Sequence, residues 1–357
     1  MKRVLVSRTD ITRAALDDAP DGGLRDGQAR LALDSFALTT NNITYAATGD
    51  VLKYWQFFPS GIDGQGIVPV WGVAVVTDSQ CALPVGTRLY GFHPMAAGQV
   101  IAPKQVAPGV WVDTADHRKG LALVYNTYTE VKGGDARQDH LRALLQPLLA
   151  TSYLLFDWLL DNDWFGAEQI IVGSASSKTG LGLCKYLAEP EGRPYRIVGL
   201  TGAGNKAFVE GLGACDQVLT YDQIETLAEV PSVYVDMAGN AEVKARLHAH
   251  LDQALRHSAA VGTSHWDKFA PPQDLKGPKP QFFFAPSQVA KRQQDWGPGG
   301  IEGRITAAWK RVAEEAGDWL DVVEHDGLDT AVEVWERLAD GEVNPREGHV
   351  VRVSSAG

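Results

Sequence analysis

The 357-residue sequence predicts an α/β protein in which a β-rich domain accompanies a doubly wound parallel sheet. Three observations support this prediction. Short β-type segments crowd the first 110 residues, helical periodicity begins near residue 140, and short buried strands then alternate with helices. The length is that of about two domains. Hydrophobic residues make up 45% of the chain, which is enough for a full core and excludes an intrinsically disordered protein.

Charge and cysteine content restrict the class of protein further. Lys and Arg number 33 against 44 Asp and Glu, and this net charge of −11 disfavours a general nucleic-acid binder. No apolar run approaches ~20 residues, so we expect no membrane span. The first ten residues indicate a strand, not a secretion signal. The three cysteines, Cys81, Cys184 and Cys215, are too scattered for a disulfide framework, so we expect a reducing, cytoplasmic compartment.

The first 110 residues have the pattern of a small barrel or sandwich. Residues 4–6 form an apolar start, residues 29–33 alternate between apolar and polar, and residues 68–76 are apolar and β-branched. Residues 86–91 indicate a turn that leads into another strand. Several strands at such short spacing are typical of an all-β domain.

The rest of the chain predicts a parallel sheet. Residues 140–160 carry leucines at helical spacing, and short apolar runs then alternate with helical patterns. Such alternation is typical of βαβ units whose sheet is covered on both faces. The predicted strands are 169–173, 196–200, 217–219, 233–235, 258–261 and 282–284. The Gly- and Pro-rich residues 295–300 indicate a break, which we interpret as a return between domains.

Residues 170–184, IIVGSASSKTGLGLC, are the most informative stretch of the sequence. A buried strand leads through small residues into a helix, and such a turn can bring backbone N–H groups and a helix N-terminus to a pyrophosphate. The pattern GxGxxG is absent, because Ser174, Ser177 and Lys178 stand where glycines are expected and Gly180 is the last one left. The ammonium of Lys178 could lie beside a phosphate instead. An ordinary βα turn is also small and polar, so both interpretations stay open. A P-loop would need a glycine before the lysine, where Ser177 stands.

The following strand favours NADP over NAD. NAD sites carry an acidic residue about 20 residues beyond the glycines, which binds the ribose hydroxyls. Residues 200–206, LTGAGNK, offer no carboxylate before Glu210. A 2′-phosphate would meet Thr201, small residues and Lys206. Lys206 could also be a solvated helix lysine.

Five motifs in order, and a tyrosine after one of them, resemble the medium-chain dehydrogenase/reductase superfamily, on its zinc-free quinone-oxidoreductase-like side. Within it, the sequence is similar to a poorly characterised branch catalogued as a domain of unknown function. Residues 85–91 resemble the VGDRVYG turn and 170–183 the AxxGGxG turn. Residues 211–218 resemble the LGAD step, which Tyr221 follows, 235–239 the VDxVG strand and 261–264 the G-x-S turn.

The resemblance implies a GroES-like β-barrel domain and a Rossmann domain that binds NADP(H). The GroES-like domain would comprise residues 1–147 and a C-terminal return, 295–357, with the Rossmann domain, 148–294, inserted between them. It implies pyrophosphate contacts from the turn at 174–180 and contacts with the adenosine phosphate from the next two strands. Further residues would lie near the nicotinamide. The implied cofactor-binding residues are Ser174, Ser177, Lys178, Thr179, Gly180, Thr201, Lys206, Tyr221, Gly239, Gly262 and Thr263.

Candidate catalytic groups are hydroxyls, amides and one histidine. Zinc relatives need Cys, His and carboxylate ligands, and no GHE sequence occurs, so we expect no metal. By position in the family pattern, Tyr45 matches a tyrosine and Asn41 or Asn42 an asparagine, and either type could polarise a carbonyl or supply a proton. Polar residues at a strand end are also ordinary turn chemistry. His265 follows the turn at 261–264 and is the histidine nearest the expected nicotinamide.

Four further residues are candidates for contact with the substrate, because they are aromatic or amide groups in expected loops of the active-site cleft. They could equally be packing residues. They are Tyr54, Tyr125, Asn126 and Tyr128.

These features predict an NADPH-dependent, zinc-independent reductase of an α,β-unsaturated carbonyl, a quinone or a related small electrophile. Two alternatives remain open: the same fold acting as a non-redox lyase or isomerase, and an NADP(H)-binding sensor without catalysis. By analogy with relatives, we expect a homodimer.

Overall fold

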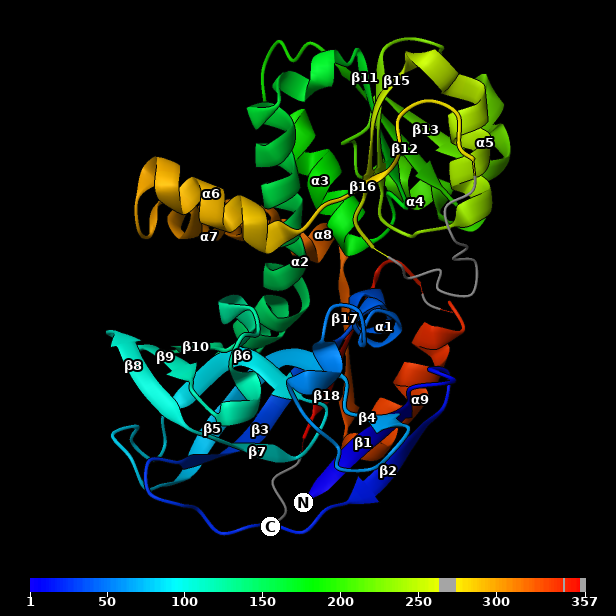
Figure 1. Ribbon diagram of the computed structural model, residues 1–357. Coiled ribbons are helices and arrows are strands. Elements are labelled where there is room, and N and C mark those ends of the chain that lie inside the picture. The colour runs from blue at the N-terminus through cyan, green and yellow to red at the C-terminus, as the bar shows by residue number, and fades with distance from the viewer. Residues whose placement is uncertain (263–273, 343, 354–357) are drawn as a thin grey trace. The chain divides into compact units, whose positions relative to one another are not determined.

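The computed structural model describes residues 1–262, 274–342 and 344–353 (Figure 1). The chain forms two units. The first comprises Met1–Leu144 together with the chain from Asp321 onward, and the second is Leu145–Leu320.

The second unit is built on a parallel sheet of six strands in the order β13-β12-β11-β14-β15-β16. Numbered along the chain, this is the order 3-2-1-4-5-6 of dinucleotide-binding folds. The strands are β11 (Gln169–Gly173), β12 (Arg196–Thr201), β13 (Gln217–Thr220), β14 (Ser232–Asp236), β15 (Leu255–Ala260) and β16 (Gln281–Phe282).

Helices cover both faces of this sheet. Alternate strand residues point to opposite sides, so each face has its own core. Ile170 and Val172 pack against a core that includes α3 (Lys178–Ala188) and the second half of α2 (Ala136–Asp161). Ile171 packs on the other face with α5 (Ala241–Leu251). Short helices α4 (Lys206–Gly211) and η6 (Tyr221–Thr226) follow β12 and β13.

The predicted return at residue 295 is wrong, because the chain leaves the second unit only at Asp321. The Gly- and Pro-rich break separates two helices of the same unit, α6 (Ala285–Trp296) and α7 (Gly300–Glu314), and α8 (Ala316–Trp319) follows them. Ile301 is fully buried in the core of the parallel sheet. Arg292 on α6 also pairs with Asp157 on α2 at 2.6 Å.

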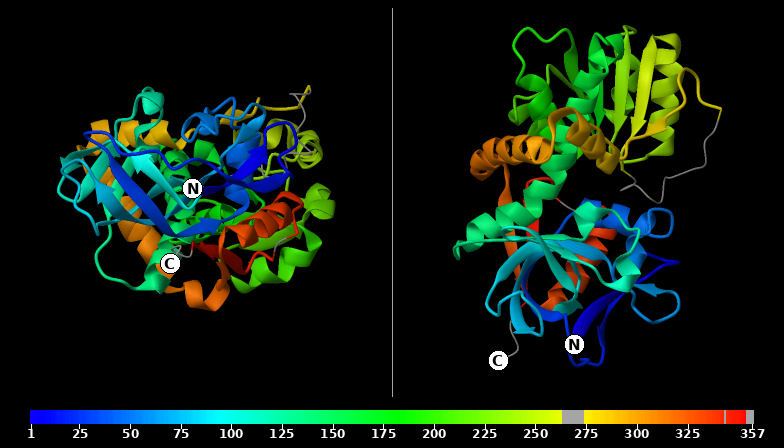
Figure 2. Two further views of the ribbon diagram at one scale, coloured as in Figure 1. Left: turned by 90° about the horizontal axis from the view of Figure 1, so that it is seen from below. Right: turned by 60° about the vertical axis from the view of Figure 1, so that its left-hand side comes forward.

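The first unit holds a curved, mostly antiparallel sheet (Figure 2). Its strands run in the order β17-β18-β3-β5-β6-β10-β9-β8, and β7 pairs with β3. A second sheet has the order β2-β1-β4. The larger sheet contains β3 (Ala29–Leu38), β5 (Pro69–Ser79), β6 (Arg88–Pro94), β7 (Gly98–Ile101), β8 (Pro103–Ala107), β9 (Val110–Asp113), β10 (Thr127–Glu130), β17 (Asp321–Asp326) and β18 (Glu347–Arg352), and the smaller one β1 (Lys2–Ser7), β2 (Ala14–Asp18) and β4 (Gln65–Gly66).

In the described part of the first unit, two helices and three short 3₁₀ turns accompany these sheets and the start of α2. They are α1 (Thr40–Ala47), α9 (Leu328–Ala339), η1 (Tyr54–Gln56), η2 (Asp116–Arg118) and η3 (Leu123–Tyr125). The polar segment after β3, interpreted from the sequence as a strand end, begins a helix. Thr39 caps α1 and Asn42 returns the hydrogen bond, which is a capping box.

Helix α2 is, within the described part of the chain, the one helix long and apolar enough by composition to cross a membrane. Core helices pass the same test, and 56% of its apolar window is buried within the protein. Leu144, Leu149 and Leu155 on this helix have no or almost no exposed surface.

Candidate functional site

The turn from β11 into α3 is closed by its own hydrogen bonds. Ser174 has a φ of +53°, and the N–H of Ala175 bonds the carbonyl of Leu200 on β12 at 2.9 Å. The hydroxyl of Ser177 donates to the Ser174 carbonyl at 2.7 Å and accepts the N–H of Gly180 at 3.1 Å. Ser177 is therefore the N-cap of α3, and its hydroxyl is engaged within the turn.

Gly180 allows the start of α3 to lie against the end of the strand. A β-carbon at this position would lie 2.5 Å from the carbonyl oxygen of Ser174 and 3.1 Å from Cα of Ala175. No larger residue fits without a shift of backbone. Lys178 and Thr179 are the first residues of α3, so their N–H groups belong to the helix N-terminus, which favours an anion. The hydroxyl of Ser152 on α2 donates a hydrogen bond to the Thr179 carbonyl at 2.7 Å.

The end of β12 is tied to this turn through Ser176, a residue that sequence reasoning missed. Thr201 has no exposed surface, and its hydroxyl bonds that of Ser176 at 3.0 Å. The side-chain amide of Asn205 reaches the same hydroxyl at 3.3 Å. Thr201, at the end of β12, thus stabilises the turn from β11 into α3 through Ser176. No carboxylate stands at the end of β12.

Lys206 and Tyr221 lie on the two segments that follow β12 and β13. Lys206 begins α4, and its ammonium is 3.9 Å from Glu210 one turn on, with a third of the side chain exposed. Burial raises the pKa of Tyr221 to about 12, and the neighbouring Ser174 offsets part of this shift. Tyr221 therefore reaches the β11–α3 turn as a neutral phenol.

Asp236, at the end of β14, holds the turn that follows this strand. One carboxylate oxygen accepts the N–H groups of Ala238 and Gly239, at 3.2 and 2.9 Å, and the other lies 3.3 Å from the ammonium of Lys244 on α5. Gly239 takes a φ of +76° in this turn. The N–H of Gly262 lies 3.4 Å from the Asp236 carbonyl oxygen. Thr263 and His265 lie outside the described residues.

The carboxyl ends of β11, β12 and β14 thus meet at one edge of the sheet. The strand order reverses between β11 and β14, and ligands of open α/β sheets bind at such a point. A close-packed helix N-terminus, a β12 end without a carboxylate and a nearby lysine fit a dinucleotide that carries a 2′-phosphate. In this second unit, the structure brings together Ser174, Ser177, Lys178, Thr179, Gly180, Thr201, Tyr221, Gly239 and Gly262.

In the first unit the structure brings together Tyr45, Tyr54 and Tyr125, here called the tyrosine cluster. The hydroxyls of Tyr54 and Tyr125 lie 3.2 Å apart, and the ring centres of Tyr45 and Tyr54 lie 4.5 Å apart. The indole N–H of Trp71 donates to the Tyr45 hydroxyl at 3.1 Å. Phe92 packs against all three rings.

The tyrosine cluster stays protonated over the ordinary pH range. Burial raises the pKa of each of its three phenols above the usual value, and neighbouring phenols add to the effect. A neutral phenol both donates and accepts a hydrogen bond. The cluster therefore offers uncharged donors among aromatic rings.

The two predicted asparagines differ in their surroundings. Asn42 is buried, and its amide accepts the Thr39 N–H at 2.8 Å and donates to the Pro69 carbonyl at 2.9 Å, so it is used in starting α1. Asn41 is half-buried, one helical turn before Tyr45 on α1, and its backbone N–H donates to the Thr39 hydroxyl at 3.3 Å.

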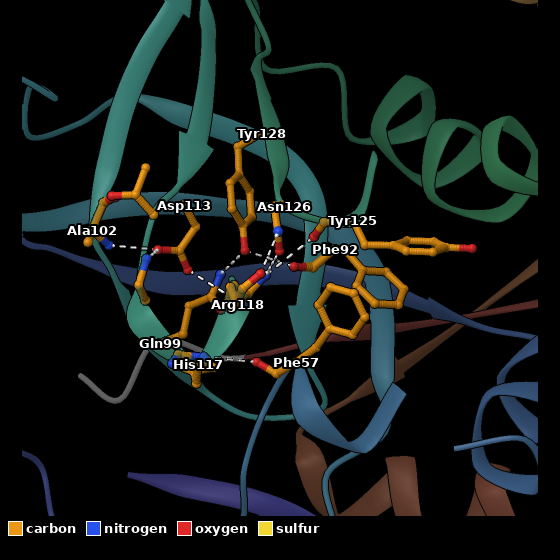
Figure 3. A network of polar contacts seen from close by, with 12 residues as sticks. Phe57, Phe92, Gln99, Ala102, Asp113, His117, Arg118, Tyr125, Asn126 and Tyr128 are labelled. Carbon is orange, nitrogen blue, oxygen red and sulfur yellow. Dashed lines mark hydrogen bonds and ion pairs between the residues drawn. The ribbon is translucent and has the colours of Figure 1, made fainter. Parts of the chain in front are cut away.

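Asn126 and Tyr128 belong to a different network, which surrounds Arg118 (Figure 3). Asn126 exchanges hydrogen bonds with Arg118, at 3.2 and 3.3 Å. Tyr128 has no exposed surface and donates to the Phe92 carbonyl at 2.9 Å. Sequence reasoning missed Arg118 and its partner Asp113, because nothing in their spacing marks them as a pair.

Two further features concern metals and cavities. Among the described residues, no three His, Cys, Asp or Glu side chains gather as metal ligands would. A cavity of about 640 Å³ in the first unit is lined by none of the predicted site residues. Its lining includes Arg8, Asp50, Trp55, Asp63 and His117.

Comparison with solved structures shows the fold. CurA from Vibrio vulnificus in complex with NADPH is 14% identical, with a TM-score of 0.65 over 99% of this chain and 100% of that one. The yhdH oxidoreductase from Salmonella enterica in complex with NADP is 14% identical, with a TM-score of 0.54 over 99% and 100% of the two chains. The quinone oxidoreductase from Coxiella burnetii is 14% identical, with a TM-score of 0.54 over 99% of each chain. The predicted fold, a Rossmann domain together with a GroES-like domain, is therefore confirmed.

No curated protein matches the sequence. A family model described as "Protein of unknown function (DUF2855)" matches residues 36–344. This span is most of the chain, and it agrees with the resemblance to a poorly characterised branch. The chain therefore belongs to the DUF2855 family.

Proposed function

We propose that this protein is an NADPH-dependent, zinc-independent reductase of an α,β-unsaturated carbonyl, a quinone or a related small electrophile. The observation that carries the proposal is the turn from β11 into α3, where only glycine at position 180 lets the helix N-terminus approach the strand end. Relatives in fold that hold NADPH or NADP in their crystals support the same conclusion.

The residues of the second unit would hold the cofactor at its three polar parts. The N-terminus of α3, with Lys178 and Thr179, would bind the pyrophosphate beside Ser174. Lys206 and Tyr221 would bind the 2′-phosphate, since an ammonium and a neutral phenol both donate to phosphate oxygens. The turns at Gly239 and Gly262, with Thr263, would lie at the nicotinamide. When bound, NADPH supplies the hydride.

The tyrosine cluster would bind and polarise the electrophile. Its phenols are neutral because they are buried, so they donate hydrogen bonds to a carbonyl oxygen without bringing a charge. Phe57 and Phe92 exclude water from these hydroxyls. We assign the proton donor to Tyr45, whose hydroxyl accepts from Trp71 and so has its own hydrogen free to donate.

The test is a binding and turnover experiment on the purified protein. Titration with NADPH and NADH, followed by nicotinamide fluorescence or calorimetry, should show tighter binding of NADPH. A panel of enones, quinones and aldehydes should then oxidise NADPH stoichiometrically. Absence of NADPH binding would overturn the proposal. Product without NADPH consumption would identify the lyase or isomerase, and binding without any turnover would identify the sensor.

The proposal includes a homodimer formed through the parallel sheet. In the described part of the chain β16 is one of the two edge strands of the sheet, and Phe282 in this strand and Phe284 just after it are 55% and 40% exposed. An exposed apolar edge is prone to pair with another chain. Light scattering should give twice the mass of one chain, and Phe282→Lys should give a monomer. If the unmodified protein is a monomer, the proposed homodimer is wrong.

A further inference from the structure

A buried ion pair between Arg118 and Asp113 lies in the first unit, next to the backbone that carries Tyr125 (Figure 3). Nε of Arg118 is 3.0 Å from Oδ2 of Asp113, and the two side chains are only 2% and 1% exposed. The other carboxylate oxygen accepts the N–H groups of Ala102 and Ala115, at 2.9 and 3.0 Å. Burying two charges costs free energy, which hydrogen bonds to the charged groups offset. Here those bonds go to one carboxylate oxygen, whereas Nε of Arg118 makes no hydrogen bond to a described residue, so its contact with Oδ2 is electrostatic.

The guanidinium of Arg118 holds the far end of the segment that it begins. Nη1 donates to the carbonyl of Tyr125 at 3.3 Å and to the side-chain oxygen of Asn126 at 3.2 Å. The amide of Asn126 donates back to the Arg118 carbonyl at 3.3 Å. Residues 118–126 therefore form a closed loop whose two ends are joined through the side chains of Arg118 and Asn126.

Tyr125 extends from this closed loop into the tyrosine cluster. Its ring lies 4.6 Å from that of Phe92 and 5.6 Å from that of Phe57, centre to centre. The guanidinium of Arg118 also lies 4.6 Å from the ring centre of Phe58 and 5.6 Å from that of Phe57. Arg118 thus fixes both the backbone that carries Tyr125 and an aromatic ring on which Tyr125 packs.

The part of the loop before Tyr125 is exposed. Leu123 and Val124, directly before Tyr125, are 65% and 49% exposed. Their side chains bury little apolar surface that could set the position of η3. The side-chain hydrogen bonds of Arg118 and Asn126 therefore restrain this backbone, together with the Thr127 hydroxyl, which donates to the Leu123 carbonyl at 2.8 Å.

We propose that Arg118 is a positioning residue whose buried pair with Asp113 sets the hydroxyl of Tyr125 against that of Tyr54. The role in turnover rests on the proposed function, while the placement of Tyr125 does not. Hydrogen-bonded groups lose their effect on a reaction when they are displaced by about 1 Å. A loosened loop should therefore weaken the tyrosine cluster although Arg118 is not one of its members.

The first test needs no substrate. The ten tyrosines are replaced by 3-fluorotyrosine, and the ¹⁹F resonances of Tyr125 and Tyr54 are assigned through Tyr→Phe variants. Arg118→Lys should shift or broaden both resonances and leave those of Tyr186 and Tyr195 in the second unit unchanged. Arg88→Lys is the matched control, because Arg88 is another arginine of the first unit that forms ion pairs, in its case with Asp34 and Asp139. It should leave Tyr125 and Tyr54 unmoved.

If Arg118→Lys does not fold, Asn126→Ser replaces it. This variant removes the reciprocal amide bonds and keeps the ion pair, and it should give the same shifts at smaller size. Unchanged Tyr125 and Tyr54 resonances in a folded Arg118→Lys or Asn126→Ser protein would overturn the proposal.

The second test is a double-mutant cycle on kcat/KM with NADPH and an accepted carbonyl substrate. Arg118→Lys should lower kcat/KM about tenfold, mainly through kcat, and should lower it less than about twofold in a Tyr125→Phe background. A merely structural role would give equal losses in both backgrounds, and that result would overturn the proposal. If the unmodified protein turns over no substrate, the proposed function fails, and the ¹⁹F result still decides the placement of Tyr125.

Discussion

The carbonyl oxygen of Ser174 occupies the space where a β-carbon on Gly180 would lie, at a separation of 2.5 Å. This contact joins the end of β11 to the first turn of α3, so any side chain at position 180 must move one of the two. The geometry of the turn, and with it the direction of the helix N-terminus, depends on this single glycine.

We predict that Gly180→Ala weakens NADPH binding at least tenfold and lowers the free energy of unfolding by roughly 1–3 kcal/mol, as overpacking does. Gly211→Ala is the matched control, since position 211 is also helical and has open space around its β-carbon. That variant should bind NADPH normally and be unchanged or slightly stabilised. Fluorescence titration and urea unfolding measure the two effects, and normal binding by Gly180→Ala would contradict the assigned site.

Lys206 should distinguish NADPH from NADH. Removing its ammonium in Lys206→Ala should weaken NADPH about tenfold, since an ammonium–phosphate contact contributes roughly 1–2 kcal/mol, and should leave NADH unchanged. Stability should hardly change, because its pairing with Glu210 is partly exposed. Lys310→Ala, on an exposed position of α7, is the control. An equal loss for both cofactors would show that Lys206 does not contact the 2′-phosphate.

The phenol of Tyr45 should give no ionisation in the pH profile of turnover. Its pKa is raised by burial above its usual value near 10, so the phenol keeps its proton throughout the range from about pH 6 to 9. In the unmodified protein, ionisation of Tyr45 should therefore cause no change of kcat/KM with pH in this range. Tyr45→Phe should lower kcat about a hundredfold at every pH. A rate that falls with an apparent pKa below 9, and loses that dependence in Tyr45→Phe, would contradict the buried phenol.

Much of the fold could be predicted because its signals are local. Buried runs such as 169–173 and 196–200 coincide with β11 and nearly with β12, and their alternation with helices was sufficient for a parallel sheet. The domain return was misplaced because Gly297 and Pro298 break a helical pair within one unit as effectively as they would separate two. The burial of Ile301 in the core of the sheet and the ion pair of Arg292 with Asp157 distinguish the two cases.

The site was predicted in part. Small residues marked the β11–α3 turn, but the capping role of Ser177 and the supporting role of Ser176 depend on hydrogen-bond partners 3 to 29 residues away. Asn42 is three residues beyond Thr39, the spacing of a capping box, so its role was available in the sequence. Nothing comparable marks Arg118 and Asp113, since their importance comes from burial that only the folded sheet creates.

His93 should make the protein less stable in mild acid. It is buried on β6, its Nδ1 accepts a hydrogen bond from the amide of Gln99 at 2.8 Å, and burial lowers the pKa of His93 to about 3. In the unfolded chain the pKa is near 6.5, so between about pH 6.5 and 3 the unfolded state binds a proton that the folded state does not. Above pH 6.5 His93 therefore leaves the free energy of unfolding unchanged. As the pH falls from 6.5 to 3, His93 lowers the free energy of unfolding progressively. At pH 5 the loss is roughly 2 kcal/mol. His93→Gln, which keeps an acceptor for Gln99, should reduce the difference in unfolding free energy between pH 7 and 5 by about that amount. An equal pH dependence in both proteins would mean that His93 is protonated, or reaches water, in the folded state.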